Sequence, residues 1–483
     1  MVREFDLVVL GAGAVGENVA DRARAGGLEV AVVEHELVGG ECTFWACVPS
    51  KTLLRGSAAL RAAREVRGAA AAVTGALDVE ATFARRDYWT SDWRDAGGVH
   101  WLTGTGAHLV RGHGRLDGER RVIVAPADGG PEEVLVARHA VAVCTGSSPI
   151  VPDVPGLADA RPWFSRDATS AHHVPSRLAV IGGGVVAAEM ATAFAGLGSE
   201  VTMLVRHDLL GTLEPFAAEL VGDGLRELGV DVRLHTSARR VSRDADDAVV
   251  LELDDGSTLV ADEVLVATGR RPHSDGLGLE SVGLEPGSPI PVDDSLAVTA
   301  TATDGAPPWL YAAGDVTARA LFTHQGKYQA RAAGDVIAAR ALGRPVDTGR
   351  YGIHVATADH TAVPSVVFSD PEVASVGLTV AEAADRGLEV RTPEVDFSSV
   401  SGAGILADDY AGHAMLVIDD ERDVVVGATF VGQGVSELVQ QATIAIVGEV
   451  PVLRLWHAVP PFPTLSEVWL RLLEADGRPE AGA

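Results

Sequence analysis

The stretch FDLVVLGAGAVG at residues 5–16 decides the fold of this chain. Its apolar first half predicts a buried strand, and Gly11, Gly13 and Gly16 predict a tight turn into a helix. A second apolar strand follows at residues 29–33 and ends at Glu34. In this arrangement the helix N-terminus receives a pyrophosphate, and an acid about twenty residues on binds a ribose hydroxyl. The pattern therefore predicts a dinucleotide site, the alternative being a tight strand-to-helix turn without a ligand.

A second copy of this pattern begins at residue 178. The strand leads into GGGVVA at residues 182–187, so that Gly182 and Gly184 are kept and Ala187 replaces the third glycine. The next strand, at residues 200–205, ends at Arg206 instead of an acid. A guanidinium favours a ribose 2′-phosphate, which a carboxylate repels, so Arg206 favours NADPH over NADH. The alternative is a solvated surface charge, because Thr212 and Leu213 in the next turn supply no second basic residue.

Two of the three cysteines, Cys42 and Cys47, stand five positions apart after a glycine pair. In a regular α-helix such residues are about 7.5 Å apart along the axis, which is more than a disulfide allows. The segment must be tightened locally, and a strained disulfide is easier to reduce. Because so small a loop stabilises little, we predict a redox-active pair, the alternative being two unrelated buried thiols. Cys144, in an apolar strand, is predicted to be a small core residue.

Length and charge narrow the class of protein. A chain of 483 residues predicts about three domains, and its 47% hydrophobic content excludes wholesale disorder. The net charge of −28 argues against nucleic acid and against an anionic membrane surface as partners. The apolar N-terminal run is interpreted as a strand and not a signal peptide. With one cysteine pair and no secreted disulfide framework, we expect a cytoplasmic protein, with no membrane partner and no metal site.

The rest of the chain predicts how these sites are divided into domains. Strands end in a Thr-Gly turn at Thr145-Gly146 and at Thr268-Gly269, one after each nucleotide fold. A proline-rich crossing at residues 149–156 suits a domain boundary. From about residue 351 the pattern changes to mixed strands and helices without a nucleotide signature.

With these motifs in this order, the chain resembles the pyridine nucleotide-disulfide oxidoreductases, the flavoprotein family that includes dihydrolipoamide dehydrogenase, glutathione reductase and mercuric reductase. The matching elements are residues 11–16, 42–51, 145–146, 182–189, 267–269, 313–315 and 366–377. The resemblance implies an α/β fold with two Rossmann-like dinucleotide-binding domains, for FAD and NAD(P), plus a C-terminal α+β dimerisation domain. The expected boundaries are 1–150 and 273–350 for the two parts of the FAD domain, 151–272 for the NAD(P) domain and 351–483 for the dimerisation domain.

The resemblance also implies roles for single residues. Cys47 is expected to be the flavin-side sulfur and Cys42 the thiol that meets the acceptor, with Lys51 near the flavin and Glu189 as its carboxylate partner. Without the resemblance, Lys51 would be a solvated lysine and Glu189 an exposed acid. The expected FAD ligands are Gly11, Gly13, Gly16, Glu34, Gly40, Lys51, Gly106, Thr145, Gly146, Ser147 and Asp315. The expected NAD(P)H ligands are Gly182, Gly184, Ala187, Glu189, Arg206 and Gly269.

The departures from the family pattern bear on the substrate. Thiol-handling relatives carry a His-x-His-Pro-Thr segment whose second histidine acts as acid and base, and here Phe462 stands in its place. Phenylalanine carries no proton, so Glu467, expected to orient the histidine, lacks its partner. His457 could substitute, the alternative being a surface or packing histidine. Residues 44–46, FWA, replace the usual Asn-x-Gly, and they either pack beneath the helix or shape a pocket for a flat acceptor such as a quinone.

Three functions follow. The first is an FAD-dependent enzyme that passes hydride from NADPH, or NADH, through the Cys42–Cys47 disulfide to a small-molecule acceptor other than a standard disulfide. It resembles the mercuric-reductase side of the family, although residues 474–483 hold no cysteine pair to deliver the ion. The second is a conventional disulfide reductase or dihydrolipoamide dehydrogenase-like enzyme, and the third a flavin-binding sensor with residual diaphorase activity. A homodimer is expected from the resemblance alone.

Overall fold

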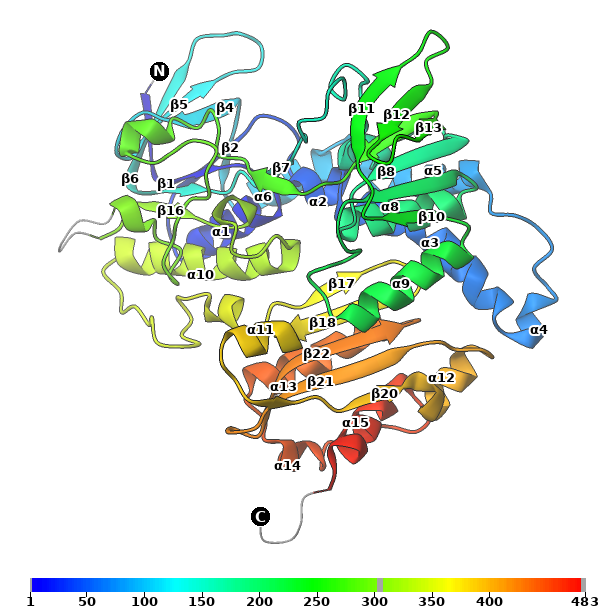
Figure 1. Ribbon diagram of the computed structural model, residues 1–483. Helices are drawn as coiled ribbons and strands as arrows, with labels where there is room; N and C mark the ends of the chain where they lie inside the picture. Colours follow the sequence, from blue (N-terminus) through cyan, green and yellow to red (C-terminus); the bar gives the residue numbers. More distant parts are fainter. Residues whose placement is uncertain (1, 302–306, 479–483) are drawn as a thin grey trace. The chain divides into compact units, whose positions relative to one another are not determined.

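The structure is a computed structural model that describes residues 2–301 and 307–478 (Figure 1). The chain divides into two compact units, each assembled from three segments. Unit 1 comprises residues 1–49, 87–150 and 270–359, and unit 2 comprises residues 50–86, 151–269 and 360–483. The division passes through two helices, α3 (Cys47–Arg64) and α5 (Val79–Trp89).

Unit 1 is built on a seven-stranded sheet with the order β3-β2-β1-β6-β5-β4, in which β16 also pairs with β6. The strands are β1 (Val2–Leu10), β2 (Val30–Glu34), β3 (His108–Arg111), β4 (His113–Leu116), β5 (Arg121–Ala125), β6 (Glu133–Val143) and β16 (Leu310–Ala312). Strands β1, β2, β3, β6 and β16 run parallel, while β4 and β5 form an antiparallel extension. The second half of β1 is an unbroken apolar run because both faces of this central strand are covered.

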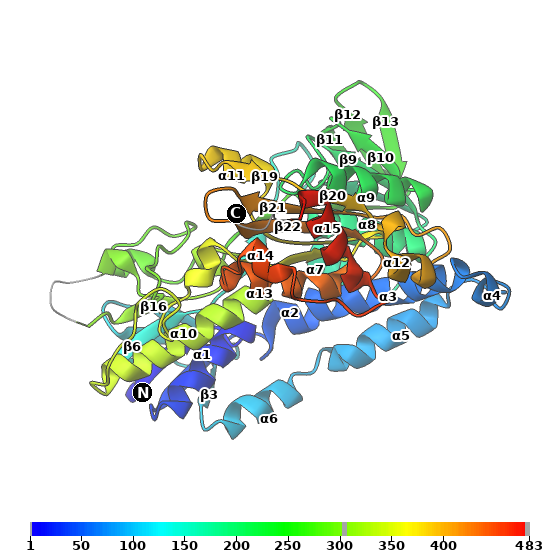
Figure 2. The same ribbon diagram turned by 90° about the horizontal axis from the view of Figure 1, so that it is seen from below.

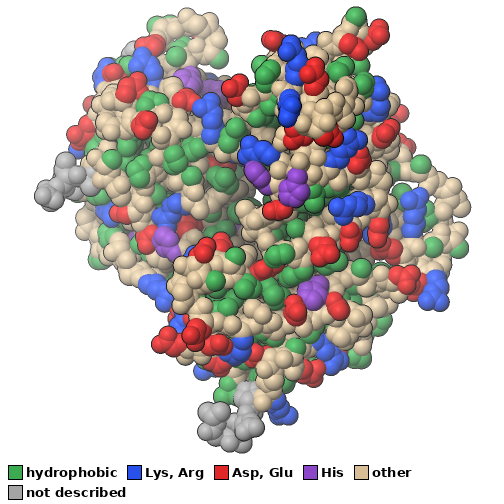
Figure 3. Space-filling model, viewed as in Figure 1, with side chains coloured by type: hydrophobic (Ala, Val, Ile, Leu, Met, Phe, Trp, Pro, Cys, Tyr) green, Lys and Arg blue, Asp and Glu red, His purple; other side chains and the backbone are tan. Residues whose placement is uncertain are grey.

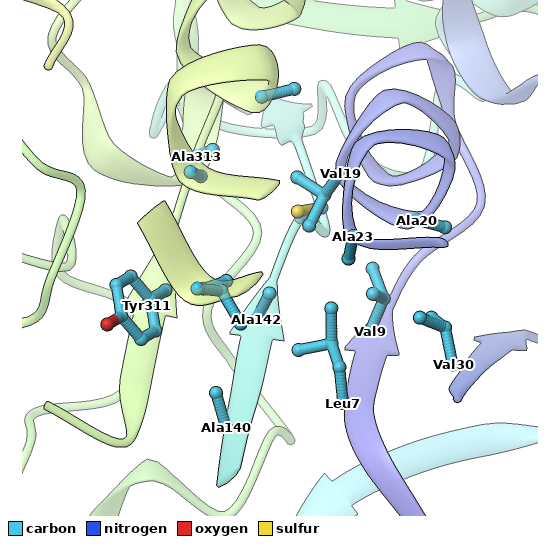
Figure 4. Packing of buried hydrophobic residues seen from close by; sticks show 14 of the residues in the cluster. Leu7, Val9, Val19, Ala20, Ala23, Val30, Ala140, Ala142, Tyr311 and Ala313 are labelled. Carbon is cyan, nitrogen blue, oxygen red and sulfur yellow. The ribbon is translucent and has the colours of Figure 1, made fainter. Parts of the chain in front are cut away.

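Two long helices, α1 (Ala14–Ala25) and α10 (Thr323–Ala341), pack against each other beside this sheet. Figure 4 shows Leu7 and Val9 of β1 pointing toward Val19 and Ala23 of α1. The helices approach closely because Gly334 has no side chain: a Cβ there would lie 2.6 Å from the Cβ of Arg22. Unit 1 also contains α2 (Gly40–Phe44), α6 (Ala96–Gly104), and the paired strands β7 (Ser147–Pro149) and β15 (Arg270–Pro272).

The second nucleotide fold lies in unit 2 as one continuous segment. Its parallel sheet has the order β10-β9-β8-β14, with β8 (Arg177–Ile181), β9 (Glu200–Val205), β10 (Asp231–Leu234) and β14 (Glu263–Val266). The helices of this segment are α7 (Ser165–Thr169), α8 (Val185–Gly196) and α9 (Pro215–Glu227). A three-stranded antiparallel sheet is inserted before β14, with β11 (Ala238–Arg243), β12 (Val249–Leu253) and β13 (Thr258–Ala261).

The remainder of unit 2 is an α+β domain around a six-stranded antiparallel sheet of order β17-β18-β22-β21-β19, with β20 beside β21. The strands are β17 (Ser365–Val367), β18 (Glu372–Gly377), β19 (Val390–Arg391), β20 (Glu394–Asp396), β21 (His413–Asp419) and β22 (Val424–Gly432). Helices α13 (Val439–Val447) and α15 (Val468–Asp476) pack on this sheet, as Figure 2 shows. The other helices of unit 2 are α4 (Arg67–Ala70), α11 (Val380–Asp385), α12 (Ser401–Leu406) and α14 (Val452–Leu455).

This architecture confirms the predicted fold class of two Rossmann-like folds and a C-terminal α+β domain. The exact domain boundaries stay a prediction. On the face shown in Figure 3, acidic side chains are scattered and interspersed with Lys and Arg. Among the helices of the described residues, none combines the length and the apolar run needed to cross a bilayer.

Candidate active site and nucleotide sites

In the first glycine turn, Gly13 has open space beside it, whereas Gly11 and Gly16 have no space for a side chain. A Cβ at Gly11 would lie 2.6 Å from the carbonyl oxygen of Cys144, and one at Gly16 only 1.9 Å from that of Gly11. At Gly13, the nearest atom to such a Cβ would be 3.8 Å away, on Gly40. Gly40 in turn faces Gly13, where its own Cβ would lie 2.8 Å from the Cα of Gly13. The N-terminus of α1 is therefore an open backbone cradle, which fits a pyrophosphate.

Glu34, at the end of β2, ties this turn to the neighbouring strand. Its side chain is buried and accepts two backbone hydrogen bonds, from Ala12 N–H and from Glu36 N–H, both at 2.7 Å. A carboxylate has about four lone-pair directions, so both oxygens keep capacity for the hydroxyls of a ribose. The residues present thus fit the adenosine half of FAD.

Thr145, Gly146, Ser147 and Asp315 meet at the end of β6. Thr145 Oγ1 donates to the carbonyl oxygen of His273 at 2.6 Å, and Ser147 Oγ donates to Asp315 Oδ2 at 2.6 Å. Gly314 packs on α1, since a Cβ there would lie 2.9 Å from Val15 Cγ2. This contact brings Asp315 to the first turn of α1, although the two are far apart in sequence.

Gly106 does not join this group. It precedes β3 at the amino edge of the sheet, beside the C-terminal end of α1, where a Cβ would lie 2.6 Å from Arg24 Nη2. Nucleotides bind at the carboxyl ends of parallel strands, so Gly106 is at the wrong edge. The glycine at the correct edge is Gly112, which follows β3, has φ +148° and donates its N–H to the carbonyl oxygen of Glu34 at 3.0 Å.

The two cysteines lie on successive helices and not on one. Helix α2 ends after Phe44, the N–H groups of Trp45 and Ala46 both donate to Glu41 O, and α3 begins at Cys47. The predicted local tightening is this helix break. Both cysteine side chains are partly buried.

The two thiols interact with each other, and Cys47 also contacts Thr323. The hydrogen bond with Cys47, together with burial, raises the pKa of the Cys42 thiol. Cys47 Sγ lies 3.3 Å from Thr323 Oγ1, on the first residue of α10. No local sequence pattern predicts this role of Thr323, because it lies far from the cysteines along the chain.

Of the two aromatic residues between the cysteines, Phe44 is buried and Trp45 is partly exposed. Phe44 is buried, and its carbonyl oxygen accepts a hydrogen bond from Trp93 Nε1 at 3.0 Å. Trp45 is partly exposed, with its ring centroid 5.7 Å from that of Phe44. Phe44 therefore packs beneath the helix, while Trp45 keeps some of its surface available to solvent.

Lys51 and Glu189 form an ion pair within unit 2. Lys51 Nζ lies 2.7 Å from Glu189 Oε2, and the other carboxylate oxygen accepts Phe368 N–H at 3.1 Å. Glu189, on α8, is only 4% exposed. The ammonium also lies 5.0 Å from the Phe368 ring centroid. With both of its oxygens bonded, the buried carboxylate fixes the position of Lys51.

The second glycine turn repeats the geometry of the first with one change. A Cβ at Gly182 would lie 2.3 Å from the carbonyl oxygen of Ala267, whereas Gly184 has open space around it. Ala187 is fully buried in the core beneath the turn. Gly269 follows β14 with φ +127°, a conformation that favours glycine. This turn also leaves its middle glycine open to a ligand.

Arg206 is exposed directly after β9, and its Nε donates to His207 Nε2 at 3.0 Å. His207, the next residue along the chain, is therefore a second nitrogen-bearing side chain beside Arg206. A ribose bound at the end of β9 would lie near these two side chains.

Near the C-terminus, the expected acid–base group is replaced by an apolar one. Phe462 is 73% exposed. Glu467 is buried, and its Oε1 accepts a hydrogen bond from Arg471 Nη2 at 2.6 Å, while its Oε2 has no hydrogen-bond partner among the described residues. His457 is exposed after α14. Arg471 is thus the side chain that bonds Glu467 in this structure.

The geometry can be compared with known families. The pyridine nucleotide-disulphide oxidoreductase model matches residues 5–335, and the dimerisation domain of the same family matches residues 363–472. The chain therefore belongs to the pyridine nucleotide-disulphide oxidoreductases. It is an oxidoreductase of a family that depends on FAD, a pyridine nucleotide and a redox-active disulfide, and it carries that family's dimerisation domain.

Relatives with different named activities match over nearly the whole chain. Mercuric reductase from Acidithiobacillus ferrooxidans is 35% identical over 96% of this chain and 81% of its own length. Dihydrolipoyl dehydrogenase from Haloferax volcanii is 33% identical over 97% of this chain and 95% of its own length. The Cu(II) complex of the HOCl-induced flavoprotein disulfide reductase RclA from Escherichia coli shares the fold with a TM-score of 0.82, at 22% identity over 98% and 99% of the two chains.

Proposed function

We propose that this chain is a homodimeric, cytoplasmic flavoenzyme that takes hydride from NADPH and passes electrons through Cys42 and Cys47 to a small-molecule acceptor other than a standard disulfide. The observation that carries this proposal is the C-terminal segment. Phe462 is exposed where a proton-carrying histidine is expected, and Glu467 is bonded to Arg471 instead. Neither thiolate activation nor protonation of a departing thiol has its usual helper.

When bound, FAD would supply the two-electron relay between NAD(P)H and the cysteine pair. The chain's own residues prepare the site for it. Lys51, fixed by Glu189, supplies a positive charge, and a fixed charge costs no reorganisation during the reaction. Thr323 contacts Cys47, the proposed flavin-side thiol, at 3.3 Å.

The proposal of a homodimer is supported by apolar side chains at the surface of the segment that matches the dimerisation domain. Five large ones are between 56% and 82% exposed: Ile405, Ile444, Leu453, Val459 and Phe462. A dimer interface that covers these side chains would remove their apolar surface from water. Sedimentation of the purified protein at several concentrations tests it, and a monomer at micromolar concentration would contradict it.

The preference for NADPH is supported by Arg206 and by His207 beside it. A 2′-phosphate presents the oxygens that a guanidinium binds best. His207 Nε2 accepts the Arg206 N–H, which holds the guanidinium at this position.

The relatives suggest which acceptors to try. The mercuric reductases favour a metal ion as acceptor, although residues 474–483 of this chain contain no cysteine. A conventional disulfide reductase is the second candidate, because the Cys42–Cys47 pair is intact and a dihydrolipoyl dehydrogenase is 33% identical.

An acceptor screen tests the two candidates. Lipoamide, glutathione disulfide, quinones, Hg(II) and Cu(II) are assayed side by side with NADPH, and Cys42→Ser is the control that removes the acceptor-side thiol. We expect turnover of a quinone or metal ion to exceed that of both disulfides by at least about tenfold, because no histidine assists thiol exchange. Brisk turnover of lipoamide would show that Phe462 does not disable it.

The cysteine assignment has its own test. Anaerobic NADPH should produce a thiolate-to-flavin charge-transfer absorption in the wild type, and Cys47→Ser should abolish it. If the protein is instead a flavin-binding sensor, NADPH should not reduce the cysteine pair, and this absorption should be absent.

A further inference from the structure

We propose that Glu17 and Lys327 form the proton-carrying pair of the acceptor-side thiol Cys42, in place of the histidine that is missing at Phe462. The inference rests on the proposed function, in which Cys42 is the thiol that meets the acceptor. Both groups belong to the same chain and the same unit as Cys42. The arrangement differs from one in which the acid and base come from a partner subunit.

The first turn of α1 lies directly against the segment that carries Cys42. Gly39 N–H donates to Ala12 O at 2.8 Å, and Gly13, the N-cap of α1, forms a bridge with Gly39. Cys42 is the third residue of α2, which begins one residue after this bridge. Glu17 is the acidic residue in the first turn of α1. Glu17 and Cys42 thus extend from two helix starts that are joined to each other.

Helix α10 reaches the same place from the distant part of the sequence. Its first residue, Thr323, contacts Cys47 Sγ, and Lys327 lies one turn later on the same helix face. Gly326 lets the helix approach α1, because a Cβ there would lie 2.6 Å from Val15 Cγ2. The starts of α1, α2 and α10 therefore converge around the cysteine pair.

The charges at this convergence suit proton transfer. Burial raises the pKa of the Glu17 carboxyl to about 7, while Lys327 opposes the shift and Glu34, from the end of β2, adds to it. For the Cys42 thiol, the hydrogen bond with Cys47 and burial raise the pKa, whereas Thr323 and Lys327 lower it. One ammonium group therefore acts on both the carboxyl and the thiol. A group that titrates near neutrality can both give and take a proton.

A purely structural role explains Glu17 poorly. The turn at the start of α1 is built to receive a phosphate, and a second anion beside it is repelled. The corresponding position in the second nucleotide fold is Ala188, a fully buried core residue. The fold itself therefore does not require a carboxyl group here.

The step balances with the hydride that NADPH provides. Its two electrons break the S–S bond, which leaves Cys47 as a thiolate and Cys42 as a thiol. The proton of the hydride enters the solvent, and Glu17 gives its own proton to the Cys42 sulfur, which leaves Glu17 as a carboxylate. While Cys42 is briefly a thiolate, Lys327 stabilises its charge. When Cys42 later reacts with the acceptor, the Glu17 carboxylate takes the proton from the thiol.

The test is the pH dependence of Cys42 alkylation in the NADPH-reduced holoenzyme under anaerobic conditions. Iodoacetamide is the probe, and the labelled peptide is quantified by mass spectrometry. We expect the wild-type rate to change with an inflection near pH 7, and Glu17→Gln to lose that inflection. Lys327→Met should slow alkylation of Cys42 at pH 7 by about tenfold, which corresponds to one unit in the pKa of the thiol.

Matched controls lie one helical turn further along each helix. Asp21→Asn on α1 and Arg331→Met on α10 remove the same charges and should leave the alkylation profile unchanged. Flavin content and thermal unfolding are measured for every variant. If Glu17→Gln does not fold, Glu17→Asp answers the same question, because a retained but displaced inflection supports the proposal.

The proposal is overturned if the Glu17 variant that folds keeps the wild-type inflection and Lys327→Met reacts at the wild-type rate. In that case NADPH still generates an alkylatable Cys42, so the proposed function stands. If NADPH generates no alkylatable Cys42 even in the wild type, the proposed function fails, and the proton-carrying pair fails with it.

Discussion

The two nucleotide folds of this chain use the same glycine turn under different packing constraints. In the first fold, Gly16 has no space for even a methyl group, since its Cβ would lie 1.9 Å from a backbone oxygen. In the second, Ala187 occupies the matching position and is fully buried. The first helix thus packs more closely on its turn than the second helix does. The second turn has room for the methyl group of Ala187, whereas the first has none at Gly16.

The two folds also differ in the residue that follows the glycine turn at the end of the next strand, which is Glu34 at the end of β2 and Arg206 after β9. Glu34 is buried and receives two backbone hydrogen bonds, so it is part of the first fold's framework. Arg206 is exposed, and its Nε donates a hydrogen bond to His207. The first site therefore suits a cofactor that stays bound, and the second suits a nucleotide that enters and leaves. Four substitutions test this comparison.

The largest effect is expected from Gly16→Ala. The new Cβ collides with the backbone of Gly11, which cannot move aside like a side chain, so we expect a loss of at least about 3 kcal/mol in the free energy of unfolding. Flavin content and denaturant unfolding measure it. The matched change in the second fold, Ala187→Gly, should cost only ~1 kcal/mol through helix propensity. Equal costs at the two positions would contradict the comparison.

Glu34→Gln should follow in size. Glutamine keeps one oxygen but turns an NH₂ group toward one of the two backbone N–H donors, which costs ~1–3 kcal/mol. We expect FAD affinity to fall by about 10- to 100-fold, measured by flavin fluorescence on rebinding to the apoprotein. Unchanged affinity would mean that the buried carboxylate serves the turn and not the ribose.

Arg206→Ala should lower kcat/KM for NADPH by about tenfold, since it removes one charge-assisted contact. The value for NADH should not change. Arg239→Ala, an exposed arginine on β11 of the same unit, is the control for lost charge alone. Equal efficiency with both nucleotides, unaffected by Arg206→Ala, would remove the phosphate role.

The last test is the pH dependence of stability that Glu17 causes, at the position where the second fold has Ala188. Because the folded pKa is about 7 against an ordinary 4.5, the folded chain holds this proton more tightly than the unfolded chain does. Below pH 4.5 the group has no effect, and as the pH rises to 7 it lowers the free energy of unfolding. Above 7 the loss is complete.

Urea unfolding at equal flavin content checks this sign. The stability of Glu17→Gln relative to wild type should increase between pH 4.5 and 7 and then level off. Asp21→Asn should show no such trend. A constant difference across this pH range would mean that Glu17 is ionised in the fold at its ordinary pKa.

The local motifs could be predicted from the sequence, and the long-range contacts could not. The glycine turns, Glu34 and the ion pair of Lys51 with Glu189 follow from patterns a few residues long or from the family resemblance. Thr323 and Lys327 approach the cysteines only because α10 packs on α1, and no spacing in the sequence encodes that packing. Gly106 was misplaced for the same reason: two glycines flank β3, and only the direction of the strand tells which of them lies at the nucleotide edge.

The split of unit 1 along the chain has a consequence for synthesis. Strand β6 pairs with β16, and α1 packs on α10, so the first nucleotide fold lacks a strand and a helix until the ribosome has passed residue 341. At about 5–20 residues per second, the roughly 300 residues between Leu7 and Tyr311 take about 15–60 seconds to make. The second fold, complete by residue 266, can close during that interval. We therefore expect the nascent chain to complete the parallel sheet of the second nucleotide fold before the first fold can bind FAD.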